Sequence, residues 1–352
     1  MKVVFYINSL CFGGAERVVC NLATQLSESG YEVVLVTSFP TEKEYVCGSK
    51  VRRIYLGNQR ICSLIKRNLF LIKKLRRVLK IECPDILISF MAEPNFRAII
   101  ASLGLKNKVM ISVRNDPEKE YSGMLIRLLA KTLFRFADGI VFQTEDAKMW
   151  FPMSIQKKSE IIYNQVDDAF YRVKCNEERC NIVTVGRLTA QKNHKLLIRS
   201  FASISDRITD NLIIYGEGEL RNELEALISA LHLEDRVILP GVTKNVAEML
   251  ASAKLFVLSS DYEGMPNALM EAMAIGIPCI ASNCPCGGPK MLFGDLLVDR
   301  LFACGDEKAL SEKIENLIFS NTDGEEEKRL AEQFRPEVII SRWKEYIEKA
   351  CK

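Results

Sequence analysis

Residues Leu255 to Pro289 read LFVLSSDYEGMPNALMEAMAIGIPCIASNCPCGGP, and this stretch decides the fold. An apolar run at Leu255–Leu258 meets a turn-rich segment, and helix-forming residues then extend from Asn267 until Gly276 ends them. A second apolar run, Ile277–Ala281, begins directly after that glycine. A strand, a helix and a strand in this order form a βαβ crossover, so the sequence predicts a parallel sheet covered by helices.

The loop between this strand and its helix is the first candidate site. In parallel sheets, ligands bind beyond the carboxyl ends of the strands, where loops lead into helix N-termini. The amides of the Asn267–Leu269 turn are suited to phosphate oxygens, and the helix dipole favours negative charge there. Glu263 and Glu271 flank this place, and carboxylates accept hydrogen bonds from sugar hydroxyls. The combination predicts a nucleotide sugar, although Glu271 in a first helical turn would also complement the dipole without any ligand.

The same stretch resembles the E-x7-E signature of retaining glycosyltransferase family four. The matching residues are Glu263, Gly264, Pro266, Glu271, Ala272, Met273, Ala274, Gly276 and Pro278. The resemblance implies an α/β protein with the GT-B fold, in which two Rossmann-like domains face each other across a cleft. It also implies transfer of a hexose or N-acetylhexosamine from a nucleotide diphosphate sugar, with retention at the anomeric carbon. The implied donor-binding residues are Glu263, Gly264, Met265, Pro266, Asn267, Ala268, Leu269 and Glu271.

Two cations follow a predicted strand in the second half. Arg187 and Lys192 lie in the string GRLTAQKN, which resembles the segment that holds the donor diphosphate in this family. Arg187 offers a planar fork to phosphate oxygens, whereas Lys192 offers a point charge. Together with the helix amides they would stabilise the departing diphosphate, so we expect no metal ion and no cofactor. Arg187, Lys192 and Glu263 are therefore the candidate catalytic residues.

The first half contributes weaker signals. Gly13 and Gly14 lie in a string similar to the family's glycine-rich opening, which faces the sugar diphosphate. Many relatives place a histidine near the transferred sugar, but both histidines of this chain, His194 and His232, lie in the second half. Three residues after a predicted strand are candidates for acceptor binding, with a capping or turn role as the alternative. They are Arg114, Asn115 and Asp116.

The order of strand and helix patterns predicts the domain organisation. We expect an acceptor-binding Rossmann-like domain at residues 1–165 and a hinge at 166–180. A nucleotide-sugar-binding Rossmann-like domain should follow at 181–334. The final helix, within 335–352, crosses back to the first domain in the GT-B fold.

Charge is distributed unevenly along the chain. Residues 1–172 carry 26 Lys and Arg against 17 Asp and Glu, and the remainder carries 22 against 28. Eleven of these cations lie between Lys50 and Ile81, where no acidic residue occurs. Apolar residues recur there at helical spacing, which predicts a basic amphipathic helix. We favour adsorption to an anionic membrane over a solvated helix face, and we find no motif for nucleic acid.

Composition and processing signals indicate where the protein works. The twelve cysteines are scattered without a Cys-x-x-Cys pair, which favours reduced thiols. The N-terminus reads as a first strand and not as a signal peptide, and no run of 18 apolar residues occurs. We therefore expect a cytoplasmic enzyme, peripheral on the inner face of the cell membrane.

The loop at 283–290 is similar to that of a subgroup acting on bacterial lipid-linked glycans. The resemblance implies a glycan acceptor carried on polyprenyl diphosphate and a role in surface polysaccharide biosynthesis. Two alternatives stay open. A non-catalytic GT-B partner subunit would be expected to lose a phosphate-binding cation or a signature glutamate, and this chain keeps both. A nucleotide-sugar 2-epimerase would need several acid/base groups near the sugar.

Overall fold

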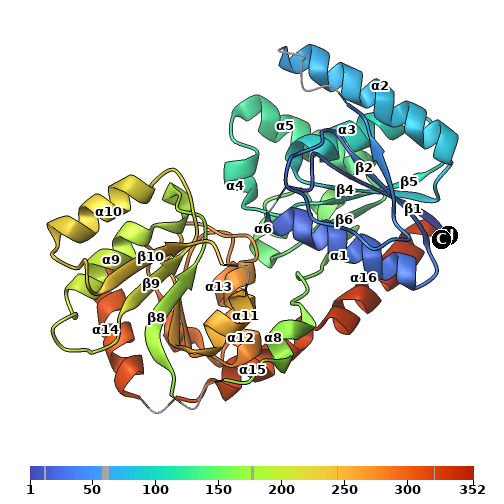
Figure 1. Ribbon diagram of the computed structural model, residues 1–352. Helices are drawn as coiled ribbons and strands as arrows, with labels where there is room; N and C mark the ends of the chain where they lie inside the picture. The colour runs from blue at the N-terminus through green and yellow to red at the C-terminus, as the bar shows by residue number, and fades with distance from the viewer. Residues whose placement is uncertain (12, 58–62, 176–177, 244, 321) are drawn as a thin grey trace. The chain divides into compact units, whose positions relative to one another are not determined.

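The computed structural model describes residues 1–11, 13–57, 63–175, 178–243, 245–320 and 322–352. The chain divides into two compact units (Figure 1). Unit 1 comprises Met1–Asn164 together with Glu337–Lys352, and unit 2 comprises Gln165–Pro336. Each unit is built on its own parallel sheet with helices packed on it, so the predicted α/β class is confirmed.

Unit 1 contains a seven-stranded parallel sheet in the order β3-β2-β1-β4-β5-β6-β7. Its central strands are continuous apolar runs because helices cover both faces of a parallel sheet. The order reverses between β1 and β4, which makes the carboxyl ends of these strands a switch point where ligands bind in such sheets. The strands are β1 (Lys2–Ile7), β2 (Glu32–Thr37), β3 (Arg52–Tyr55), β4 (Ile86–Phe90), β5 (Lys108–Ser112), β6 (Gly139–Phe142) and β7 (Ser159–Ile161).

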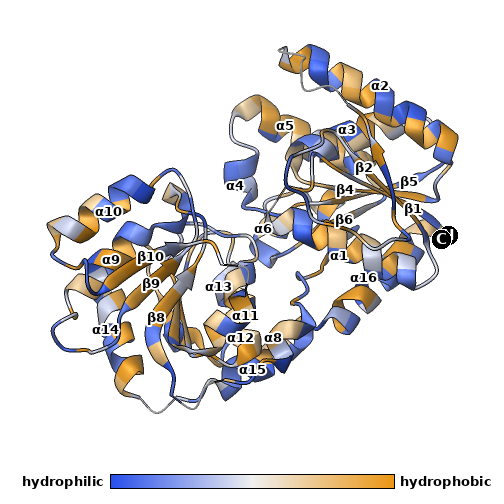
Figure 2. Cartoon of the chain, viewed as in Figure 1, coloured by the Kyte–Doolittle hydropathy of each residue, from blue (hydrophilic) through white to orange (hydrophobic). Residues whose placement is uncertain are grey.

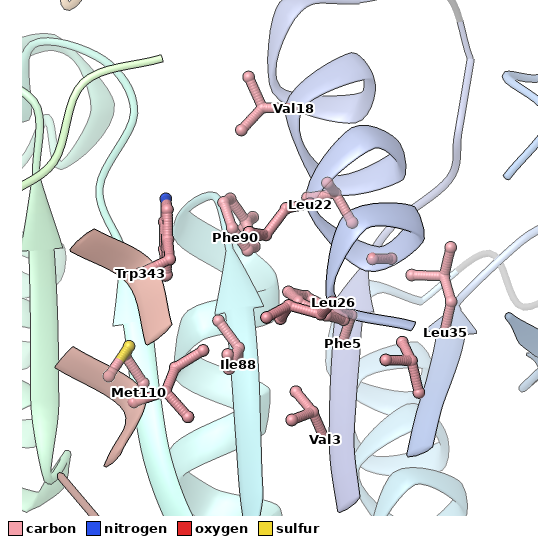
Figure 3. Close-up of a cluster of buried hydrophobic side chains, with 14 of the residues drawn as sticks. Val3, Phe5, Val18, Leu22, Leu26, Leu35, Ile88, Phe90, Met110 and Trp343 are labelled. Carbon is pink, nitrogen blue, oxygen red and sulfur yellow. The ribbon is translucent and has the colours of Figure 1, made fainter. Parts of the chain in front are cut away.

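The helices of unit 1 include one from the far end of the chain, α16. Its Trp343 packs on Phe90 of β4 with ring centroids 5.8 Å apart, in the core that Figure 3 shows. The Tyr346 hydroxyl accepts from Ile140 N at 2.9 Å and lies 2.6 Å from Lys158 O. The helices are α1 (Gly14–Glu28), α2 (Leu64–Glu82), α3 (Ala92–Ser102), α4 (Pro117–Glu120), α5 (Met124–Leu133), η1 (Phe134–Phe136), α6 (Glu145–Met149), α7 (Met153–Gln156) and α16 (Pro336–Cys351).

The predicted basic helix forms as α2, and part of its apolar stripe is buried, which corrects our interpretation of that part. Leu71, Leu75 and Leu79 are buried in a core shared with strands β1, β2 and β4. This part of the stripe cannot enter a lipid headgroup region, whereas Leu64, Ile65 and Leu69 near the start of the helix are exposed. The start of the basic run forms the edge strand β3, and Arg60 lies outside the described residues.

Unit 2 contains a six-stranded parallel sheet in the order β10-β9-β8-β11-β12-β13. The strands are β8 (Cys180–Val185), β9 (Leu212–Tyr215), β10 (Val237–Gly241), β11 (Ala253–Leu258), β12 (Cys279–Ser282) and β13 (Leu301–Phe302). The helices are α8 (Asp168–Arg172), η2 (Ala190–Lys192), α9 (His194–Ala202), α10 (Arg221–Ala230), α11 (Val246–Ala251), α12 (Asn267–Ile275), α13 (Gly288–Phe293), η3 (Val298–Arg300), α14 (Glu307–Phe319), α15 (Glu325–Ala331) and η4 (Glu332–Phe334).

The predicted βαβ crossover is confirmed as β11, α12 and β12. Strand β11 pairs parallel to β12, and α12 ends at Gly276 with a φ of 84°, a left-handed conformation that suits glycine. One prediction in this region is wrong in part, because the expected loop at 283–290 already enters α13 at Gly288.

Two broader expectations concern the thiols and the membrane. Every cysteine within the described residues is a free thiol, in agreement with the scattered spacing. Among the helices of the described segments, none combines the length and apolarity needed to cross a bilayer.

Candidate functional site

The strongest candidate site lies beyond the carboxyl ends of β8 and β11 in unit 2. The loop from Ser259 to Pro266 leaves β11 and leads directly into α12. Ser260 and Glu263 are buried, although both are polar and lie in a loop. Buried polar groups need partners, and here the partners come from the loop that follows β8.

An ion pair forms the centre of the site. Lys192 Nζ lies 2.5 Å from Glu263 Oε1, and Ser260 Oγ donates to the same oxygen at 2.8 Å. The structure thus brings together two of the three candidate catalytic residues. Because an ammonium has three donors, Lys192 can hold Glu263 and still present hydrogens to a phosphate oxygen. The pair fixes a cation and a carboxylate side by side.

Several further bonds tie the two loops together. Asp261 N donates to Gln191 O at 2.8 Å, and the Gln191 side-chain amide donates to Tyr262 O at 2.9 Å. Asn193 Nδ2 donates to Asp261 Oδ1 at 2.8 Å. Sequence reasoning missed these positioning residues, although they lie inside the two motifs that it quoted. They hold the Lys192 backbone in place without a ligand, which reduces the entropy lost on binding.

Two glycines allow backbone segments to approach closely around this pair. At Gly216, with a φ of 143°, an added Cβ would lie 1.9 Å from Gly186 O. At Gly288, at the start of α13, an added Cβ would lie 1.9 Å from Gly264 O. Any larger residue would push the loops apart, so these positions require glycine because of the close contact.

His194 is a buried residue next to the two candidate cations, Arg187 and Lys192. Burial, together with the nearby Lys192 charge, lowers the pKa of His194 to about 4, so the ring is neutral at physiological pH. Its Nε2 lies 3.3 Å from Arg187 O. The Arg187 side chain is exposed, and within the described residues it forms no ion pair. His194 therefore supports the Arg187 backbone, while the guanidinium stays accessible to a ligand.

The N-terminal end of α12 differs in two details from the prediction. Glu271 is the fifth residue of the helix, buried, and outside the first turn, so the alternative of a first-turn dipole partner is wrong. The amide of Leu269 donates to Pro266 O at 3.1 Å and is already used within the turn. The predicted use of the Leu269 amide for phosphate is therefore not supported.

The candidate residues of unit 1 lie at the carboxyl ends of its strands. Gly13 and Gly14 begin α1 after β1. The Arg114 guanidinium donates to Asn164 Oδ1 at 2.5 Å, and burial lowers its pKa to about 9. Asp116 Oδ1 accepts from Glu118 N and caps α4, in line with the capping alternative. Asn115 follows Arg114 in the same loop and is partly buried.

A polar cluster that sequence reasoning missed lies beside these residues. Glu120 Oε1 accepts from Ala92 N at 3.1 Å, and burial raises the pKa of Glu120 to about 7. Within the described residues, Glu120 Oε2, Tyr121 Oη and Asn95 Oδ1 are buried without a hydrogen-bond partner. No pattern singles out Glu120 in the sequence, because only the fold brings α4 against the start of α3.

No three His, Cys, Asp or Glu side chains of the described segments are grouped so that they could hold a metal ion. Two parallel sheets covered by helices, with a lysine–glutamate pair at the strand ends of one of them, define a protein of the doubly wound α/β class, in which ligands bind at the carboxyl ends of the strands.

Comparison with known families then gives the identity. Residues 12–170 match the family described as Glycosyltransferase Family 4, and residues 167–335 match the family described as Glycosyl transferases group 1. The chain therefore belongs to the glycosyltransferases that combine these two domains.

Relatives and solved structures agree with this assignment. A glycosyltransferase of Methanocaldococcus jannaschii is 30% identical over 249 residues, which cover 63% of this chain and 61% of that protein. An α-1,4-N-acetyl-D-galactosaminyltransferase of Campylobacter jejuni, named for a diphospho-undecaprenol-linked acceptor, is 28% identical over 90% of this chain and 89% of its own. The structure of Anabaena Alr3699/HepE with UDP and glucose superposes with a TM-score of 0.82, at 19% identity and 99% coverage of both chains. The predicted GT-B fold is confirmed.

Proposed function

We propose that this glycosyltransferase moves a hexose or N-acetylhexosamine from a nucleotide diphosphate sugar to a glycan acceptor, with retention at the anomeric carbon. The observation that supports the proposal best is the contact between Lys192 and Glu263 beside the start of α12. Lys192 and Arg187 would take the diphosphate, whose negative charge grows as the glycosidic bond to the donor breaks. Glu263 and Glu271 would accept hydrogen bonds from hydroxyls of the donor.

The acceptor is proposed to be a glycan carried on polyprenyl diphosphate, used in bacterial surface polysaccharide assembly. The Campylobacter relative is named for such an acceptor. The basic helix α2 supports a location at an anionic membrane, because Lys73, Lys74 and Arg77 are solvent-facing cations on its outer surface. The protein would then work in the cytoplasm, on the inner face of the membrane.

The proposal is tested by incubating the purified protein with a panel of nucleotide diphosphate sugars and reading released products by mass. Hydrolysis or transfer from one or more donors is expected, and product anomers analysed by NMR should keep the donor's configuration. An inverted product would contradict retention. A complete lack of turnover with all donors, in the presence of lipid-linked acceptors, would favour a non-catalytic partner subunit.

Metal independence is tested in the same assay. Because side chains and helix amides supply the positive charge, activity is expected to survive an excess of EDTA. Loss of activity that magnesium or manganese restores would contradict this expectation.

A further inference from the structure

Helix α5 presents an unusual surface for a protein of this kind. Met124, Leu125 and Leu128 are 89%, 69% and 59% exposed, and Ile126 and Leu129 are exposed as well. Phe136, in the η1 turn that continues the helix, is also exposed. Figure 2 shows α5 as a mostly apolar helix at the surface of unit 1. A contiguous exposed apolar face of this kind marks an interaction site.

Little of α5 is used to stabilise unit 1. Within the helix only Ala130 is buried, and Phe134 follows it in η1. A helix of 10 residues is marginal in water on its own, and Gly123 provides no side-chain cap. The apolar face therefore serves something outside unit 1.

Cations accompany this face. Arg127, Lys131 and Arg135 follow one another at intervals of four residues, and no acidic residue occurs between Tyr121 and Ala137. Residues four apart lie on the same side of an α-helix, so Arg127 and Lys131 form a basic stripe beside the apolar face of α5, and the exposed Arg135 follows in η1. This arrangement of basic and apolar sides is typical of helices that lie in the interface of an anionic membrane.

An indole ring adjoins the stripe. The Lys131 ammonium lies 4.2 Å from the centroid of the Trp150 ring, and Trp150 Nε1 donates to Glu118 at 2.8 Å. Glu118 also pairs with Arg127 at 2.5 Å. Tryptophan is enriched at membrane interfaces because its ring is apolar and its N–H is polar. The position of Trp150 beside both cations fits a side chain at headgroup depth.

We propose that α5 is the membrane-inserting helix of this enzyme, with its apolar face at the acyl boundary of an anionic bilayer and its cations at the phosphates. The inference rests on the proposed membrane location and deepens it. Helix α2 would supply mainly long-range attraction, because Leu71, Leu75 and Leu79 are already buried in the core, although apolar side chains near its start are exposed. Helix α5 would supply the hydrophobic contact that holds the protein once it has arrived.

Vesicle binding tests the proposal. Leu125→Ser combined with Leu128→Ser is expected to lower the partition coefficient onto anionic vesicles by about tenfold or more, because each leucine loses a favourable transfer from water. The matched control is Leu64→Ser combined with Ile65→Ser on α2, where the side chains are 61% and 74% exposed. Both pairs lie at the surface, so thermal unfolding should stay close to wild type. An equal loss in both double variants, or none in the α5 variant, would overturn the assignment.

A depth measurement supports the binding assay. Leu128→Trp fluorescence should be quenched by vesicles with bromine on their acyl chains, beyond the quenching of the wild type, whereas Leu64→Trp should not. Light scattering without lipid should give the mass of one chain, 39.9 kDa. A dimer that the Leu125→Ser and Leu128→Ser changes dissociate would assign the face to a second copy and overturn the proposal.

The outcomes separate this inference from the proposed function. If the protein turns over a nucleotide sugar but the α5 variant binds vesicles as well as the wild type, the proposed activity stands and the membrane role of α5 is wrong. Vesicle binding through α5 without any turnover would support the role of α5 and contradict the proposed glycosyltransferase activity.

Discussion

Lys192 is the residue on which the proposed donor site depends most. Its ammonium is the cation that contacts Glu263, and its own backbone is held by Ser259 Oγ, which donates to Lys192 O at 2.9 Å. We predict that Lys192→Ala lowers kcat/KM by about 10²-fold, because a lost charge-assisted contact costs on the order of 3 kcal/mol in the transition state. Steady-state kinetics with the best donor checks this.

Lys195→Ala is the matched control for this change. Lys195 is more exposed, three residues further along the chain, and pairs with Glu223 on α10. An exposed ion pair contributes little, so near wild-type kinetics are expected for that variant. The assignment of Lys192 fails if both alanine variants retain wild-type kcat/KM.

Glu271 gives an independent prediction for the same site. It is buried on α12 and belongs to the signature motif. Glu271→Gln keeps the shape of the side chain and removes the charge, so we expect a decrease in kcat/KM of about 10²-fold with little loss of stability. A large fall in thermal stability together with unaltered activity per folded molecule would make Glu271 a structural residue.

Glu120 predicts a pH dependence of stability. Its carboxyl would ionise near pH 4.5 in the unfolded chain, but burial raises its pKa to about 7 in the folded protein. Between these values the folded state binds more protons, so the stability that Glu120 contributes is present below pH 4.5 and is lost as the pH rises through 7. Glu120→Gln should therefore stabilise the protein by up to about 3 kcal/mol at pH 8 relative to pH 4.5.

Denaturant unfolding at the two pH values measures this effect. Glu42→Gln, at an exposed position in a loop, is the control. It should change the unfolding free energy only slightly, and by the same amount at both pH values. A Glu120→Gln effect that does not depend on pH would show that the pKa of Glu120 is the same in the folded and unfolded states.

At the scale of elements, the sequence predicts a helix or strand best where local residues mark both of its ends. The boundaries of α12 follow from its helix formers and from Gly276, which adopts a left-handed conformation. Strand β3 was missed because Arg52–Tyr55 is short and carries cations, and it forms only because the edge of β2 is available. Helix α13 was missed in part because it begins at Gly288. Glycine is needed there because the backbone of Gly264 lies close by, and no local sequence pattern reveals that approach.

Docking of α16 on unit 1 supplies an element-scale prediction. The Tyr346 hydroxyl of α16 accepts from Ile140 N in β6 and donates to Lys158 O, which directly precedes β7. Tyr346→Phe leaves these backbone groups without that partner, so we expect a loss of about 1–3 kcal/mol in unfolding free energy. Tyr31→Phe, which removes an exposed bond from Tyr31 to Glu348 on the same helix, should cost much less. Equal losses would indicate that packing, and not the buried hydrogen bonds, holds α16.

At the scale of the whole molecule, the two halves differ in how much of their site could be predicted. The proposed donor residues Lys192, Glu263 and Glu271 lie in two compact motifs of unit 2, so they could be proposed from spacing along the chain. In unit 1 the cluster around Glu120 combines α4 with the start of α3. Groups that become neighbours only through the sheet leave no signature in a single sequence.

Unit 1 is assembled from both ends of the chain, and this has a consequence for biosynthesis. Translation completes Gln165–Pro336 before it reaches Trp343 and Tyr346, which fill the core beside β4 and β6. Domains fold as units during synthesis. Unit 2, although second in the gene, can therefore be the first to finish folding, and unit 1 must wait on the ribosome with part of its sheet uncovered. Chains stalled before Glu337 should resist protease in unit 2 and remain sensitive in unit 1.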